Sequence, residues 1–332
     1  MGETVAVRLG RVRRVFATLI AVAALWGAAT GLLVPRAAYR LSVEPEESWR
    51  DTCGTGHALV GPARGWLGAP TCATCATHRS EAGPTTPSEA GPTTSSGVSE
   101  AGPTVPSGTG AAAPSGVSGT GPTAPASFTR PRAVRLRTVL IAPRRTALIT
   151  PRRTVLTAPV LTALACAALA AVTGPRPELA VWLLLAPFGV LLATVDARVR
   201  RLPDPLTLPL AAAVPLLLLG AELLPYEAGS WFDALFGGLA LSAGYLVLFL
   251  IRPSGMGFGD VKLALCVGAA LGWYGWGVLL VGTFAAFLAG SLYGLGLVAL
   301  RRGSGKSAIP FGPFMLGGAL VGLLLGALSA SP

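Results

Sequence analysis

Seven long apolar segments follow one another in the second half of the chain, at roughly residues 155–173, 178–195, 206–224, 231–251, 261–276, 277–299 and 308–328. Each is bounded by proline, glycine or charge, and most approach the ~20 apolar residues that a helix needs to cross a bilayer. An eighth segment, residues 15–34, lies near the amino terminus. Backbone groups in lipid must be satisfied within the spanning structure, so these segments predict an all-α, polytopic membrane bundle of about eight transmembrane helices.

The composition also favours a membrane protein over a soluble one. Of the 332 residues, 52% are hydrophobic and 12% are charged, which is far from the balance of a soluble globular domain. The net charge of +11 comes largely from arginines beside apolar segments, where orientation in the membrane explains them better than nucleic-acid binding does. The sequence has no recognisable nucleic-acid reader motif, so we expect membrane lipid and no nucleic acid among its partners.

The amino-terminal half divides into three regions by composition. Residues 1–41 form a predicted N-terminal transmembrane helix, and residues 42–78 form a polar module that contains cysteine and histidine. Residues 79–154 combine a Gly/Pro/Ser/Thr linker with a basic juxtamembrane run, and the linker contains a repeated octapeptide (SEAGPTTP, SEAGPTTS and SEAGPTVP). This composition cannot bury a core, so we expect a largely disordered loop.

Two aspartates stand at the ends of apolar segments. Asp260 follows Gly257 and Gly259 in a glycine-rich turn, and Asp196 ends an earlier segment before a basic turn. Carboxylates at such a boundary are costly, which points to a function. A pair at low dielectric cannot comfortably ionise twice, so it shares one proton. One group can then take a proton from water while the other polarises a peptide carbonyl, as in an aspartyl protease that needs no cofactor.

The sequence around these aspartates resembles the type IV prepilin peptidase family, a family of Gly-x-Gly-Asp membrane aspartyl proteases. The resemblance is carried by Gly255, Gly257, Gly259, Asp260 and Lys262, by Asp196 with Leu202, Pro203 and Asp204, and by Ile309, Pro310, Phe311, Gly312 and Pro313. It covers residues 155–328 well. It implies that residues 155–332 form a membrane-embedded aspartyl peptidase domain with Asp196 and Asp260 as its catalytic residues.

Single residues of these motifs have other interpretations. Asp260 could cap a helix, and Asp196 could pair with a following arginine. Asp204 stands between two prolines, which favour a rigid turn, so it is structural or positions the substrate. Lys262 lies on a different helix face from Asp260 and is interpreted as an interface anchor or a substrate contact. The prolines and glycine of the last motif shape the start of the last helix or line the site.

The resemblance implies an endopeptidase that cuts the basic leader from type IV prepilins or pilin-like (pseudopilin) secretion subunits. Full-length members also methylate the new amino terminus with S-adenosylmethionine, a role associated with the amino-terminal module. That module is degenerate here, so methylation stays open. Two alternatives use the same acids: a presenilin-like intramembrane protease, against which the Leu-Pro-Asp motif argues, and an ion-coupled or proton-coupled transporter. Inverted repeats would support the transporter, and residues 155–328 show none.

The charges between the segments predict the orientation of the chain. Basic residues lie on the side of both aspartates: Arg198, Arg200, Arg201, Arg252, Lys262, Arg301, Arg302 and Lys306. Acidic residues lie on the other side: Glu178, Glu222, Glu227 and Asp233. The positive-inside rule therefore predicts a multi-pass plasma-membrane protein whose active site and long loop, 35–154, face the cytoplasm. Arginines before residue 15 favour the opposite orientation for the first helix, and the heavier basic run at 130–153 outweighs them.

The polar module contains a candidate metal site. Cys72 and Cys75 have the spacing of metal ligands, and Cys53 with His57 would complete a four-ligand zinc site. The first cysteine pair of the family is broken, because Gly56 stands where its second cysteine is expected. Chance grouping in a degenerate loop is the alternative. Zinc is thus a candidate structural ligand, whereas proteolysis by the two aspartates requires none.

Overall fold

The computed structural model describes residues 2–44, 47–54, 56–68, 72, 74–75, 151–253, 256–300 and 309–330. The predicted disordered linker lies outside the described residues, as do Gly255 and the basic loop 301–308. All described residues belong to one compact unit. The division of the chain at residues 41, 78 and 154 stays a prediction.

The described part of the chain is built from α-helices. They are α1 (Gly2–Gly31), α2 (Val34–Leu41), α3 (Pro62–Gly65), α5 (Pro151–Thr173), α6 (Glu178–Val199), α7 (Asp204–Glu222), α8 (Trp231–Ile251), α9 (Phe258–Gly272), α10 (Trp276–Ala299) and α11 (Gly312–Ser329). Seven stretches are long and apolar enough to cross a membrane: Arg13–Leu41, Val155–Thr173, α6, α7, α8, α10 and α11. The predicted fold class is confirmed, and the chain is a multi-pass membrane protein.

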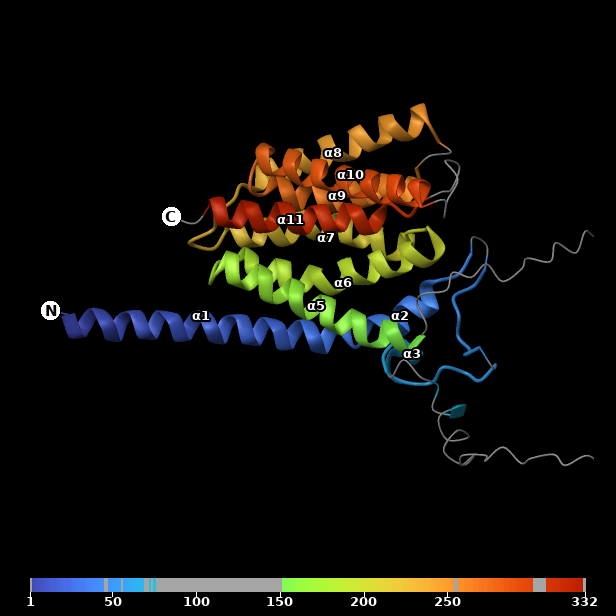
Figure 1. Cartoon of the computed structure of the whole chain (residues 1–332), viewed down its shortest axis with the longest axis horizontal. Helices are drawn as coiled ribbons and strands as arrows, with labels where there is room; N and C mark the ends of the chain where they lie inside the picture. Colours follow the sequence, from blue (N-terminus) through green and yellow to red (C-terminus); the bar gives the residue numbers. More distant parts are fainter. Residues whose placement is uncertain are drawn as a thin grey trace, which may run out of the picture. The chain divides into compact units, whose positions relative to one another are not determined.

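The remaining predicted span, residues 261–276, corresponds to α9, which differs from the other seven. It has 15 residues, so it is about 22 Å long, shorter than the ~30 Å hydrocarbon core. Most of its residues are buried, because α7, α8, α10 and α11 all contact it (Figure 1). Glycines let α8 approach closely, since a Cβ at Gly268 would lie 2.5 Å from the carbonyl oxygen of Gly237. The carboxyl-terminal half of the bundle is therefore packed around α9.

The amino-terminal helix packs on α5 and α6. Pro187 lies inside α6, and its missing N–H leaves the carbonyl of Leu183 without its helical partner. The indole nitrogen of Trp26 on α1 donates a hydrogen bond to that carbonyl at 2.9 Å. On α5, a Cβ at Gly31 of α1 would lie 2.5 Å from Cα of Pro159. Close helix contact through glycine is typical of packing in membranes.

The last turns of α6 and the first turns of α9 and α11 lie at the same end of the bundle, beside α2 (Figure 1). An apolar cluster joins α2 to α6, with Ala38 and Leu41 on one side and Leu191 and Val195 on the other. Val195 directly precedes Asp196. Residues of the amino-terminal region therefore support the helix that carries the first aspartate.

Two buried arginines of α2 hold the loop that follows it. Arg36 donates to the carbonyls of Gly65 and Val60, each at 2.8 Å. Arg40 donates to the carbonyl of Arg64 at 2.9 Å. The loop that contains the cysteines is thus attached to the same end of the bundle as the aspartates.

Candidate active site

Asp196 is held by the start of another helix. It lies near the end of α6 and is 4% exposed. Its Oδ2 accepts a hydrogen bond from the backbone N–H of Gly312, the first residue of α11, at 2.9 Å. The first N–H groups of a helix have no partner within the helix, and the local dipole favours an anion there. The structure therefore stabilises this carboxylate from a segment far along the chain.

Asp260 is held by its own glycine-rich turn. It is the third residue of α9, and its Oδ2 accepts a hydrogen bond from the N–H of Gly257 at 3.2 Å. The side chain is 7% exposed. This contact matches the interpretation of Asp260 as a residue that caps its helix, and it also fixes the carboxyl group in a buried position.

The two carboxyl groups share one buried site. Asp196 lies within electrostatic range of Asp260, and the motifs that carry the two residues are in direct contact. Leu202 follows Asp196 in the first motif, and a Cβ at Gly259 in the second would lie 2.9 Å from Cβ of Leu202. A side chain at position 259 would therefore push the two motifs apart. The structure brings together the pair that the sequence predicts, whereas their catalytic roles stay predictions.

Asp204 and Lys262 form a separate ion pair at the same end of the bundle. Lys262 Nζ lies 2.7 Å from Asp204 Oδ1 and 5.0 Å from the centre of the Phe258 ring. The Asp204 side chain is 57% exposed, so this pair contributes little to stability. The pair joins the first turn of α7 to α9, which supports the interpretation of Lys262 as an interface anchor.

The other predicted motif residues begin the helices around the site. Pro203 is the N-cap of α7, and Gly257 is the N-cap of α9. Pro310 precedes α11, and Pro313 is its second residue. Proline at the start of a helix removes an N–H that would have no partner there. These residues therefore set where the helices begin, and hence where the two aspartates lie.

One buried polar residue of the site was not predicted from the sequence. Tyr245 on α8 is 2% exposed, and its hydroxyl has no hydrogen-bond partner among the described residues. The charge of Asp260 acts on this hydroxyl. The ring packs 6.1 Å from that of Phe311, which directly precedes Gly312. A lone tyrosine in an apolar segment has no sequence signal that would distinguish it from a packing residue.

The four predicted metal ligands are also brought together. The ligand atoms of Cys53, His57, Cys72 and Cys75 all lie within 4.8 Å of one another. Cys53 Sγ lies 3.8 Å from Cys75 Sγ and 3.7 Å from His57 Nδ1. Two ligands bound tetrahedrally to zinc at about 2.0–2.3 Å stand roughly 3.5–3.8 Å apart. The spacing of these atoms therefore fits a four-ligand zinc site.

Gly56 explains how histidine joins this cluster. Its φ of +87° lies in the region that favours glycine. The turn brings the chain back, so that the N–H of Cys53 donates to the carbonyl of His57 at 2.8 Å and the N–H of Gly56 donates to the carbonyl of Cys53 at 2.9 Å. The residue that breaks the expected cysteine pair is thus the residue that lets His57 take part.

Comparison with known proteins identifies a family that matches the middle of the chain. Residues 183–295 match the sequence profile described as the type IV leader peptidase family. The chain is 35% identical over 156 residues to the prepilin leader peptidase/N-methyltransferase of Aeromonas salmonicida, covering 45% of this chain and 48% of that protein. The proteins of the same name from Pseudomonas aeruginosa (34% over 146 residues, 43% and 49% covered) and Dichelobacter nodosus (37% over 154 residues, 44% and 49% covered) are also similar.

The chain spans about half the length of the curated relatives that it matches. No solved structure matches it significantly. The region matched by the family profile contains both buried aspartates and the ion pair between Asp204 and Lys262. Residues 183–295 of this chain thus carry the sequence profile of the type IV leader peptidase family.

Proposed function

We propose that this protein is a membrane aspartyl endopeptidase that removes the leader of type IV prepilins or pilin-like subunits, with Asp196 and Asp260 as its catalytic pair. The observation that carries the proposal is the burial of both carboxyl groups in one site, each held by the backbone N–H of a glycine. An acid pair held in this way keeps its position without a metal. The family supports the choice of substrate.

The proposed reaction begins from a pair that holds one proton. The ionised carboxylate takes a proton from a water molecule, whose oxygen attacks the carbonyl carbon of the scissile peptide bond. The protonated carboxyl group gives its proton to the carbonyl oxygen, which forms a neutral gem-diol. A proton then passes from the pair to the leaving nitrogen as the C–N bond breaks. One hydroxyl of the diol returns its proton to the pair as it becomes the carbonyl of the new carboxylic acid, so the pair again holds one proton.

Both aspartates accept an N–H at the start of a helix, so helix position does not tell the base from the acid. The two groups titrate as a coupled unit, and the proposal assigns the single proton to the pair.

Tyr245 has a supporting role in this proposal. Its hydroxyl is buried within electrostatic range of Asp260 and has no hydrogen-bond partner in the described part of the chain. Such a hydroxyl can donate a hydrogen bond to the carbonyl oxygen of the substrate as charge develops on it. A donor already in place needs no reorganisation when the reaction occurs.

We infer that the site faces the cytoplasm. Arg198 lies in the last turn of α6, and Arg201 and Arg252 follow α6 and α8, all at the end of the bundle where the aspartates lie. Glu222 and Glu227 lie at the other end. The positive-inside rule favours the cytoplasm for the basic end. Cysteines introduced at Pro253 and at Tyr226 should be labelled by an impermeant maleimide from opposite sides of the membrane. Labelling of both from one side would contradict this orientation.

The Cys/His cluster is proposed to hold a structural zinc ion. Cys53, His57, Cys72 and Cys75 would supply all four ligands, and a site closed in this way leaves no position for a reactive water. Zinc would then steady the loop after α2, which Arg36 and Arg40 attach to the bundle. The acid and base of the reaction remain the two aspartates.

The proposal is tested by co-expressing the protein with a tagged type IV prepilin and weighing the product. The wild-type protein should produce a leader-sized loss of mass, and Asp260→Asn should produce none. A transporter predicts no loss with either protein, and a presenilin-like protease predicts a cut inside the apolar helix of the substrate. The same mass measurement detects methylation of the new amino terminus, the second activity that the names of the relatives carry.

A further inference from the structure

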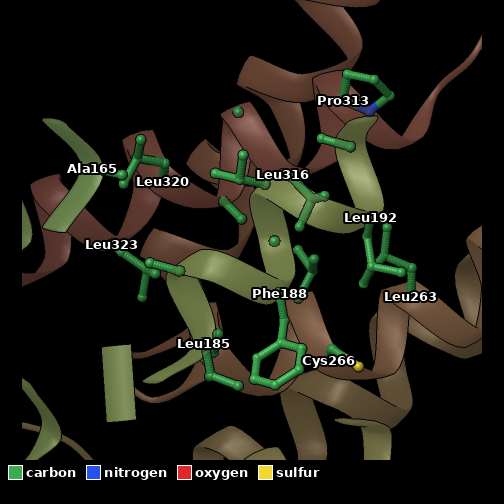
Figure 2. Close-up of a pocket in the computed structure, with 18 of the residues that line it drawn as sticks. Ala165, Leu185, Phe188, Leu192, Leu263, Cys266, Pro313, Leu316, Leu320 and Leu323 are labelled. Atoms are coloured by element: carbon green, nitrogen blue, oxygen red, sulfur yellow. The ribbon is translucent and has the colours of Figure 1, made fainter. Parts of the chain in front are cut away.

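A large apolar cavity lies between the helices that carry the candidate site. Its volume is about 760 Å³, and residues of α5, α6, α7, α9 and α11 line it. Figure 2 shows Leu185, Phe188 and Leu192 of α6 facing Leu316, Leu320 and Leu323 of α11 across it. No charged side chain lines the cavity within the described part of the chain. An apolar surface of this size at membrane depth is suited to an apolar occupant.

One end of the cavity adjoins the two aspartates. Ala193 and Ala197, which line it, stand on either side of Asp196 along α6. Leu263 lines it one turn after Asp260, and Pro313 lines it directly after Gly312. An occupant that fills the cavity would therefore end at the buried carboxyl pair.

We propose that this cavity is a docking groove for the apolar helix of a membrane-inserted protein substrate, with the end of that helix at the aspartate pair. This inference rests on the proposed peptidase function. The cavity holds one face of a helix, and the remaining faces of that helix stay against lipid. Small residues on both walls, Gly189 and Ala193 on α6 and Gly317 on α11, let another backbone approach closely. The bond that is cut then lies just beyond the apolar segment.

A lipid chain is the competing occupant, and the acid pair argues against it. A lipid seated in the groove would bring its phosphate toward two buried carboxyl groups, where a second anion is unfavourable. A peptide brings amide groups instead, and their carbonyl oxygen can accept a proton from the pair. Residues that neighbour Asp196 and Asp260 along the chain line the cavity, and this arrangement favours a protein helix.

Gly317 offers a direct test, because a side chain there would enter the groove without disturbing the fold. Gly317 lines the cavity, and a Cβ at this position meets no atom within 4 Å. Gly244 on α8 is a matched control, since a Cβ there also meets nothing within 4 Å and Gly244 does not line the cavity. The two variants are Gly317→Leu and Gly244→Leu.

Two substrates should be compared: a complete membrane-inserted prepilin and a short peptide that spans the same cleavage site without the apolar helix. Gly317→Leu should raise KM for the complete prepilin by about tenfold, because the leucine side chain would occupy part of the groove and weaken binding of the substrate helix. It should leave cleavage of the short peptide unchanged, and Gly244→Leu should leave both unchanged. Normal cleavage of the complete prepilin by Gly317→Leu would overturn the groove.

Cross-linking separates failure of the groove from failure of the peptidase function. A photoreactive phenylalanine at Leu320 in the groove should form an adduct with the tagged prepilin. One at Phe284, which is 67% exposed on α10, should not. An adduct at Leu320 without any cleavage would support the docking groove and refute the proposed peptidase function. Cleavage without that adduct would refute the docking groove and support the peptidase function. Cleavage with an adduct to lipid alone would lead to the same conclusion.

Discussion

The backbone N–H of Gly312 donates a hydrogen bond to Oδ2 of Asp196 at 2.9 Å and so joins two motifs that stand 116 residues apart. A Cβ at Gly312 would lie 2.8 Å from that same oxygen. The carboxyl group therefore occupies the space that any side chain at position 312 would need. Glycine at this position sets the place of Asp196 relative to α11, and it does so through its size and its N–H together.

Replacing Gly312 by alanine should lower the rate of cleavage by about a hundredfold, because displacement of a reacting group by roughly 1 Å has costs of this order. Protein abundance in the membrane should change little. Gly244→Ala on α8 is the control, since a Cβ there meets no atom within 4 Å and Gly244 does not line the cavity. Steady-state cleavage of a tagged prepilin is the measurement. Equal rates for the two variants would show that the contact does not hold Asp196 in its active position.

Asp196→Asn and Asp260→Asn should each abolish cleavage, because the amide can neither take nor give the proton of the pair. Asparagine keeps the volume and an oxygen that can accept the N–H of Gly312 or Gly257, so both variants should fold. Asp204→Asn should retain substantial activity, because Asp204 forms a largely exposed ion pair outside the buried pair. Cleavage at the wild-type rate by either of the first two variants would rule out the aspartyl mechanism.

Much of the site can be predicted from the sequence, because the residues that form it stand in short, recognisable sequence motifs. Apolar length gives the helices, and glycines before Asp260 mark a turn that can come close to another segment. The Cys/His set was predicted from spacing, although Cys53 and His57 are not a usual pair. In the structure their side chains meet because Gly56 turns the chain between them.

Other features depend on contacts between distant segments and have no local signal. The sequence places Asp196 at the end of α6, whereas the structure also places it at the start of α11 through Gly312. Hydropathy predicts a span at 261–276 like the other seven, whereas α9 is surrounded by four helices and enclosed by protein. Tyr245 looks like any aromatic residue in an apolar helix until Asp260 is placed beside it.

Removing the Tyr245 hydroxyl should slow the chemical step without weakening the fold. Tyr245→Phe deletes a buried hydroxyl that has no partner among the described residues, so stability should be unchanged or slightly higher. If the hydroxyl donates to the substrate carbonyl, kcat should fall by about tenfold to a hundredfold, with little change in KM. Tyr293→Phe on the exposed side of α10 serves as the control. A full kcat for Tyr245→Phe would assign this tyrosine to packing alone.

Loss of the zinc ligands should loosen the loop after α2 and leave peptide cleavage largely intact. Purified protein should contain about one zinc per chain, because the four ligand atoms have the spacing of a tetrahedral site. Replacing Cys72 and Cys75 by serine should remove that zinc and make the loop more sensitive to protease, because metal binding is tied to local folding. The helices should stay folded, since α2 packs on α6 through apolar residues such as Ala38 and Val195 and not through the Cys/His cluster. Elemental analysis that finds no zinc, with equal protease sensitivity of the wild-type protein and the serine variant, would refute the metal site. Loss of cleavage together with loss of zinc would show that the loop also supports the aspartate pair.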